Sequence, residues 1–220
     1  MSTARLLTVS GLLSFNGGLI DVACFFGLKG LLAAHITGNL AVLCASLVLG
    51  HAGLIGKIVA VPEFMVVAGL THAAGRALQV RGWPVPRILL GVVMVLLALF
   101  LVLALRFGPF EDADSITALA TSLAAIAAMA VQNGAQRSYL PRLAPTTFMT
   151  GNATQASVDL ADLLAGAADK AQKRRLAYVG LNLACFGLGC AVAAAAFMAI
   201  GFAAVAITLP AAALAIALAP

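Results

Sequence analysis

Two copies of one tripeptide carry the residue types best suited to holding a ligand. Thr37-Gly38-Asn39 recurs as Thr150-Gly151-Asn152, 113 residues further along, and a run typical of a helix follows each copy. Threonine and asparagine side chains cap free backbone N–H groups at a helix start, and glycine lets a ligand or another backbone approach. Such helix starts attract anions. Two of them facing one centre would form a binding site; the alternative is a structural role as two packed helix ends.

A polar stripe follows the second tripeptide. Asn152, Gln155, Asp159 and Asp162 recur at spacings of three and four residues, which places them on one face of a helix. Because a carboxylate facing lipid is costly, we expect Asp159 to face a protein interior, a cavity or an aqueous end. The alternative is that the two aspartates lie near the membrane surface and pair with arginines of the basic cluster 170–175.

Asp21 lies inside the first apolar run, without a charged neighbour in sequence. We expect either a proton-coupling carboxyl or a structural one, paired in space with Arg76, Arg137 or His72. His35, a lone histidine, is expected to pack rather than to bind a ligand.

Two Asn-Gly pairs, Asn16-Gly17 and Asn133-Gly134, repeat at a distance of 117 residues and are expected to mark helix breaks near the tripeptides. No catalytic or metal-ligating set is expected. The candidate binding residues are Asn16, Asp21, Thr37, Gly38, Asn39, Asn133, Thr150, Gly151, Asn152, Gln155 and Asp159.

The amino-acid composition indicates whether the chain that carries these residues is surrounded by water or by lipid. Hydrophobic residues make up 63% of the 220, and charged residues only 10%. Soluble domains are about half apolar and a quarter charged, so the chain is an integral membrane protein. Its apolar runs are long and continuous, which favours helices. The net charge of +5 comes mostly from scattered basic residues that flank apolar runs as membrane anchors, so no nucleic-acid partner is expected. The four cysteines lie in apolar runs and are expected to be buried small side chains.

The expected fold is an all-α polytopic membrane protein with about eight hydrophobic segments in two related halves, 1–110 and 111–220. Four spans per half predict a parallel repeat. The run 87–106, the most uniformly apolar, is expected to face lipid. Basic residues are nearly balanced between the two membrane sides in this scheme, which leaves open a re-entrant segment. The expected segments are 6–28, 37–55, 57–80, 87–106, 116–137, 147–167 and two within 176–219, with short or broken helices at the tripeptides.

Four stretches together resemble the YoaK-like family of bacterial membrane proteins, a family of unknown function. The resemblance covers nearly the whole chain and implies a bacterial inner-membrane protein of transporter-like character, with no established substrate. The stretches that carry it are Leu13-Ser14-Phe15-Asn16-Gly17-Gly18-Leu19-Ile20-Asp21, Ala34-His35-Ile36-Thr37-Gly38-Asn39, Gln132-Asn133-Gly134-Ala135 and Pro145-Thr146-Thr147-Phe148-Met149-Thr150-Gly151-Asn152.

These features favour a multi-pass small-molecule transporter or channel, not an enzyme. Its central site would lie between the two tripeptides and take an anionic or polar solute, with proton coupling as an option. The expected partners are the lipid bilayer and that solute; a homo-oligomer is open, and no cofactor is expected. One alternative is an intramembrane enzyme acting on a lipid, although the sequence has no HExxH, GxSxG or DDxxD motif. The other is a structural or assembly protein that transports nothing.

Overall fold

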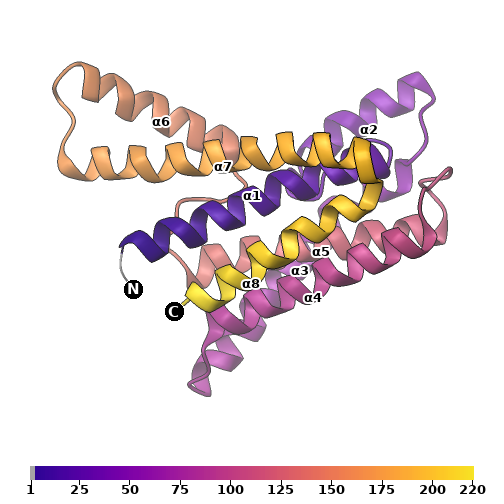
Figure 1. The fold of residues 1–220 in the computed structure, drawn as a ribbon, viewed down its shortest axis with the longest axis horizontal. Coiled ribbons are helices and arrows are strands. Elements are labelled where there is room, and N and C mark those ends of the chain that lie inside the picture. Colours follow the sequence, from indigo (N-terminus) through magenta and orange to yellow (C-terminus); the bar gives the residue numbers. More distant parts are fainter. Residues whose placement is uncertain (1–2) are drawn as a thin grey trace.

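The chain forms helices throughout the part that the computed structural model describes, residues 3–220 (Figure 1). The helices are α1 (Thr3–Gly27), α2 (Gly38–Leu49), α3 (Leu54–Val80), α4 (Val85–Phe107), α5 (Ile116–Tyr139), α6 (Met149–Leu164), α7 (Lys170–Ile200), the 3₁₀ helix η1 (Gly201–Ile207) and α8 (Thr208–Leu218).

Five helical stretches are long and apolar enough to cross a membrane, which supports the membrane class and corrects the expected eight spans. They are α1, α3, α4, α5 and the 49-residue stretch Lys170–Leu218. A straight helix of that length would measure roughly 73 Å, about twice what a bilayer core needs. The stretch instead turns at Gly201, whose φ of 57° lies in the left-handed region. It therefore forms two legs that run in opposite directions, α7 and then η1 with α8.

The two helices that begin at the tripeptides are too short to cross. α2 has 12 residues and α6 has 16, against about 20 for a span. Each follows an irregular stretch, 28–37 before α2 and 140–148 before α6. We call 28–49 the first broken segment and 140–164 the second broken segment. The expectation of short helices at both tripeptides is confirmed.

Contacts along the helices give their directions. α1 runs parallel to α7, because Ser10 bonds to Asn182 at 2.8 Å and Phe26 packs on Phe197 with ring centroids 5.7 Å apart. α3 runs parallel to α5: Gly56 lies beside Ser122, and Gly75 beside Tyr139.

α8 runs antiparallel to both α1 and α4. The Asn16 amide donates to the carbonyl of Thr208, at the start of α8. Val9 and Leu13, nearer the start of α1, cluster with Ala215 and Ala219 at the end of α8. Arg87 donates to the carbonyl of Ala219, and Phe100 packs on Phe202.

These directions correct the expected parallel repeat. Helices α1, α4 and α7 point one way, and α3, α5 and α8 point the other. The first helices of the two halves, α1 and α5, are therefore antiparallel (Figure 1).

The basic residues are not balanced between the two ends of the bundle. Of the 13 lysines and arginines, only Lys29, Lys57 and Arg106 lie toward the end at which α1 finishes. The expectation of near balance was wrong because it counted the two broken segments as crossings. The end that holds the chain termini carries Arg5, Arg76, Arg81, Arg87, Arg137, Arg142, Lys170, Lys173, Arg174 and Arg175.

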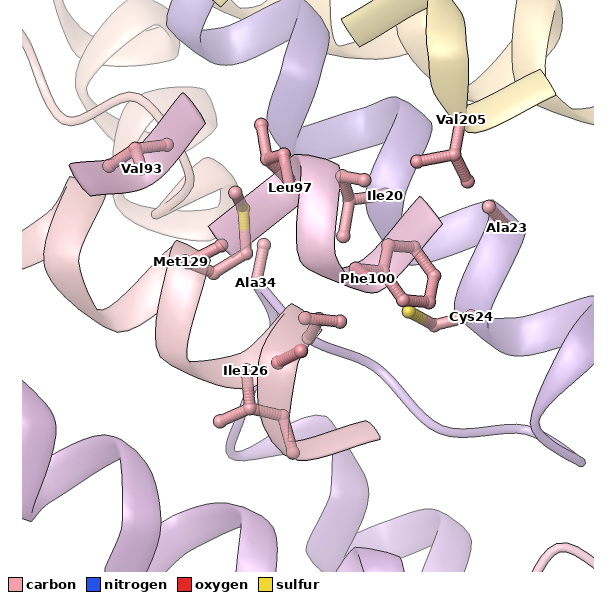
Figure 2. Close-up of a cluster of buried hydrophobic side chains, with 14 of the residues drawn as sticks. Ile20, Ala23, Cys24, Ala34, Val93, Leu97, Phe100, Ile126, Met129 and Val205 are labelled. Carbon is pink, nitrogen blue, oxygen red and sulfur yellow. The ribbon is translucent and has the colours of Figure 1, made fainter. Parts of the chain in front are cut away.

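The core lies between α1, α4 and α5. Ile20 and Cys24 of α1 face Leu97 and Phe100 of α4 and Met129 of α5 (Figure 2). About 72% of the α1 span and 61% of the α5 span is buried, against 22% for α3, so α1 and α5 are the central helices. The run 87–106 contributes only one face to this core: 33% of the α4 span is buried, while Val95, Leu99 and Val102 are exposed on its outer face, in keeping with the prediction that this run faces lipid.

Glycines allow the closest helix approach, between α1 and α7. A Cβ atom on Gly18 would lie 2.2 Å from the Phe186 carbonyl oxygen, and one on Gly189 would lie 2.1 Å from that of Phe15. Only glycine lets the two backbones come this near. This crossing falls near the middle of both helices, where the two broken segments arrive.

Candidate functional site

Asp21 holds the first broken segment against α1. One carboxylate oxygen accepts the backbone N–H of Ala34 at 2.6 Å, and the other lies 2.6 Å from Nδ1 of His35. Asp21 is only 3% exposed. The hydrogen bond to this carboxylate raises the pKa of His35 above its usual value. The expected partners Arg76, Arg137 and His72 were wrong, because the loop that follows α1 folds back and brings His35 to Asp21.

The asparagines of the tripeptides bind the loops that precede them. The Asn39 side chain accepts the N–H of Leu32 at 2.8 Å and donates to the Leu32 carbonyl at 2.7 Å. Asn152 donates to the carbonyl of Pro145, also seven residues earlier, at 2.6 Å. Because proline has no N–H, Asn152 makes one backbone bond to its loop where Asn39 makes two. We call each of these asparagine–loop contacts a staple.

Neither tripeptide caps its helix by a side chain. Thr37 precedes α2 without a side-chain capping bond and is exposed. Thr150 and Gly151 lie inside the first turn of α6, because that helix already starts at Met149. The capping expectation was wrong. Each asparagine bonds to the loop seven residues before it, and no side chain caps the N-terminus of either helix.

The two Asn-Gly pairs do not break their helices, which corrects a further expectation. Asn16 is buried inside the continuous α1, with its side-chain oxygen unbonded and its amide directed to α8. Asn133 lies inside α5 and accepts the Thr147 hydroxyl at 2.6 Å. Asn133 therefore holds the second broken segment, as Asp21 holds the first, whereas Asn16 belongs to a different contact.

The broken segments meet the α1–α7 crossing from two sides. The His35 ring packs edge-on against Phe186 of α7, with centroids 5.1 Å apart. A Cβ atom on Gly17 would lie 2.9 Å from the Thr147 methyl group and 3.5 Å from the Phe186 ring. The two loops thus end at one cluster of side chains inside the helix bundle.

A cavity of about 910 Å³ opens beside the second broken segment. It extends from the N-terminal ends of α1 and α7 to the start of α6. Three of the candidate residues line it: Gly151, Asn152 and Gln155. Neither tripeptide threonine does, and no residue of the first broken segment is among its walls. The remaining lining residues are Thr3, Leu6, Arg137, Pro141, Arg142, Leu143, Ala144, Pro145, Phe148, Ala171, Arg174, Arg175, Tyr178 and Val179.

The floor of the cavity lies well inside the bundle. Asn182 donates to the carbonyls of Ala144 and Pro145 at 3.2 and 3.1 Å. Asn182 comes twelve residues after the start of α7 at Lys170, or roughly 18 Å along the helix axis. Asn182 bonds to Ser10, seven residues after the start of α1, so the break before α6 packs about two helical turns in from that end, and the cavity lies between the break and the basic end of the bundle.

The polar stripe of α6 faces α7. Arg175 donates to Asp159 from Nε at 2.8 Å, and Gln155 donates to the same carboxylate at 3.0 Å. The guanidinium holds the pKa of Asp159 below its usual value. Asp162 accepts from Gln172 at 2.6 Å instead of pairing with an arginine. Asp159 is thus a structural partner that fixes Arg175 at the cavity wall.

Sequence reasoning missed the arginines of the cavity. Arg137 was expected as a partner of Asp21, and Arg174 belonged to the basic cluster expected to pair with Asp159 or Asp162. Nothing in the spacing of Arg137, Arg142 and Arg174 indicates that they line one cavity. Among residues 3–220, no group of three or more histidine, cysteine or acidic side chains is placed to hold a metal ion.

A second, smaller cavity of about 430 Å³ lies at the other end of the bundle. It is lined by aromatic side chains that include Phe197 and Phe202, and it touches the first broken segment at Lys29.

Comparison with known proteins identifies the family of this chain. No curated protein and no solved structure matches the chain. A family model described as "Protein of unknown function (DUF1275)" matches residues 9–219, which is nearly the whole chain. The YoaK-like name is not tested by this match and stays a prediction. The chain belongs to the DUF1275 family of proteins of unknown function.

Proposed function

We propose that the protein is a small-molecule transporter or channel of the bacterial inner membrane, and that an anionic or polar solute enters through the cavity beside α6. The observation that carries this proposal is the cavity itself. Its volume of about 910 Å³ is within the range of ligand sites, and it reaches the irregular backbone before α6 at Ala144 and Pro145. Irregular backbone within a membrane is tolerated where it is buried in protein or lines a water-filled space.

The antiparallel halves support the same function. If α5–α8 repeats α1–α4, then α5 corresponds to α1, α6 to α2 and α7 to α3. The parallel pair α1–α7 then corresponds to the parallel pair α5–α3, and the hairpin of α2 with α3 corresponds to that of α6 with α7. Each half then has three crossings and one broken segment. This inverted repeat with interrupted helices at the centre is an arrangement that many transporters use for alternating access.

The charge distribution supports one orientation in the membrane. Loops rich in lysine and arginine stay in the cytoplasm. Because ten of the 13 basic residues lie at the end that holds both termini, we place that end in the cytoplasm. The cavity then opens to the cytoplasm.

Flux through purified protein in liposomes tests the proposal. We would measure uptake of small anions and neutral polar solutes, in wild type and in two tryptophan variants of α7. Ala171 lines the cavity, whereas Ala177 is exposed on the same helix and is not among the lining residues. Ala171→Trp should reduce flux at least about tenfold, while Ala177→Trp should match wild type.

Two results would count against transport. One is the absence of flux for every solute tested, with wild type indistinguishable from empty liposomes. The other is flux that Ala171→Trp and Ala177→Trp change equally, which would place the path elsewhere. Asn39→Ala and Asn152→Ala add a second comparison, since loss of either staple should alter flux if both breaks frame the path.

A further inference from the structure

The cavity beside α6 has a strongly cationic wall. Arg137 comes from α5, Arg142 from the loop after it, and Arg174 and Arg175 from the start of α7. No aspartate or glutamate is among the lining residues. Three separate elements therefore direct guanidinium groups to one space.

Only one of these four charges is neutralised within the described chain. Arg175 pairs with Asp159, which is fully buried behind it. Arg137, Arg142 and Arg174 have no ion-pair partner among residues 3–220. About three positive charges, all on exposed side chains, are therefore free to pair with an anion that enters the cavity.

Membrane anchoring alone does not account for this grouping. Arg76, Arg81 and Arg87 lie at the same end of the bundle and would serve as anchors equally well, yet they are outside the cavity. Anchors need only reach the headgroup region, whereas these four arginines surround a pocket that continues down to Asn152.

The other polar groups at the cavity are suited to the same ligand. Tyr178 contributes a hydroxyl group, and the α6 start contributes backbone N–H groups without a side-chain cap. Guanidinium groups bind phosphate oxygens through two parallel hydrogen bonds, and a helix start favours the same charge. A cavity of about 910 Å³ is large enough for a phosphate carried on an organic group.

We propose that this cavity binds a phosphate group carried by a small organic molecule or by a lipid, with Arg137, Arg142 and Arg174 as its ligands and Arg175 held at the wall by Asp159. This inference rests on the proposed function and names the class of its substrate.

Binding to the full-length protein tests the inference without transport. We would titrate detergent-purified protein with glycerol 3-phosphate and with glycerol. The lipid arm would compare nanodiscs of phosphatidylcholine with and without phosphatidylglycerol, and would follow lipid binding by native mass spectrometry. Glycerol 3-phosphate should bind and glycerol should not, if the source is a soluble phosphate. Retention of phosphatidylglycerol alone would assign the site to a lipid headgroup, with the same phosphate chemistry.

Arginine variants locate the binding. Arg142→Gln and Arg174→Gln should each weaken binding of the phosphate probe about tenfold or more. Arg76→Gln removes the same charge at the same membrane end, outside the cavity, and should leave binding unchanged. Arg142 is exposed on a loop, so this variant keeps the test valid if the helix variant fails to fold.

The inference is overturned if neither phosphate probe binds, or if Arg76→Gln weakens binding as much as the cavity variants do. These failures differ from failure of the transport proposal. Flux of another solute that Ala171→Trp blocks would leave transport standing without phosphate. Phosphate binding without any flux would leave the site standing without transport.

Discussion

The two broken segments share a plan and differ in how firmly they are held. In the first, the Asp21 carboxylate binds a backbone amide and His35, and Asn39 makes two bonds to Leu32. In the second, neutral Asn133 binds the Thr147 hydroxyl, and Asn152 makes one backbone bond, to Pro145. Charge-assisted bonds are about twice as strong as neutral ones.

This difference assigns different roles to the two segments. The first segment acts as an anchor, because Asn39 bonds to its own loop and the loop amide and His35 bond to Asp21 of α1. The second leaves its helix start and the nearby arginines open to the larger cavity. The proposed site is therefore built on the broken segment whose loop is held more weakly.

The largest effect is expected at the crossing that both segments share. Gly189→Val would place a Cβ atom 2.1 Å from the Phe15 carbonyl oxygen, which forces α1 away from α7. We expect a loss of about 3 kcal/mol or more, because backbone cannot yield as a side chain can. Thermal unfolding in detergent measures it. Gly187→Val is the matched control, since a Cβ atom there meets nothing within 4 Å; equal stability of the two variants would show that the crossing tolerates separation.

A smaller, pH-dependent effect is expected in the first broken segment. The pKa of His35 is raised in the folded protein by its bond to Asp21. The ionic part of this bond is fully present below the unfolded pKa of about 6.5 and is lost as the pH rises through the raised folded value. His35→Gln should therefore cost more stability near pH 6 than near pH 9, by about 1 kcal/mol, since the His35 side chain is 33% exposed and partly screened.

Melting temperatures across this pH range test the anchor role of Asp21 and His35. His51→Gln, at an exposed histidine in the turn before α3, serves as the control. A cost for His35→Gln that stays constant from pH 6 to pH 9 would mean that the pair acts as a neutral hydrogen bond.

The smallest effect tests the proline that distinguishes the second broken segment. Pro145→Ala supplies an N–H group where Leu32 has one, and this group should donate to the free side-chain oxygen of Asn152. The new bond adds about 1 kcal/mol, and loss of the proline constraint in the unfolded chain removes a similar amount. Stability should change little, but hydrogen exchange should find the amide of residue 145 protected, like that of Leu32. Rapid exchange at residue 145 would show that proline is not what separates the two staples.

Part of this structure could be predicted from local sequence. Apolar composition identified the membrane class, because the cost of placing charge in lipid acts on every residue independently. The repeated tripeptides marked both short helices, and the polar stripe placed Gln155 and Asp159 on one face, where they bond to each other.

Other features depend on contacts that hydropathy does not record. The run 28–49 is apolar, but Lys29 and Gly30 have positive φ and end α1, so the chain turns back without crossing. Hydropathy cannot separate residues buried in protein from residues facing lipid, since both are apolar. Counting that run and 147–167 as spans reversed the expected relation of the halves and divided the basic residues evenly.

The sequence by itself thus determined the solvent, the helical class and the positions of the two breaks, each of which follows from local chemistry. The tertiary structure alone decided the direction of each helix, the pairing of Asp21 with His35, and the meeting of Arg137, Arg142 and Arg174 around one cavity. Those outcomes depend on how separate helices and loops pack against one another, and no spacing along the chain records that packing.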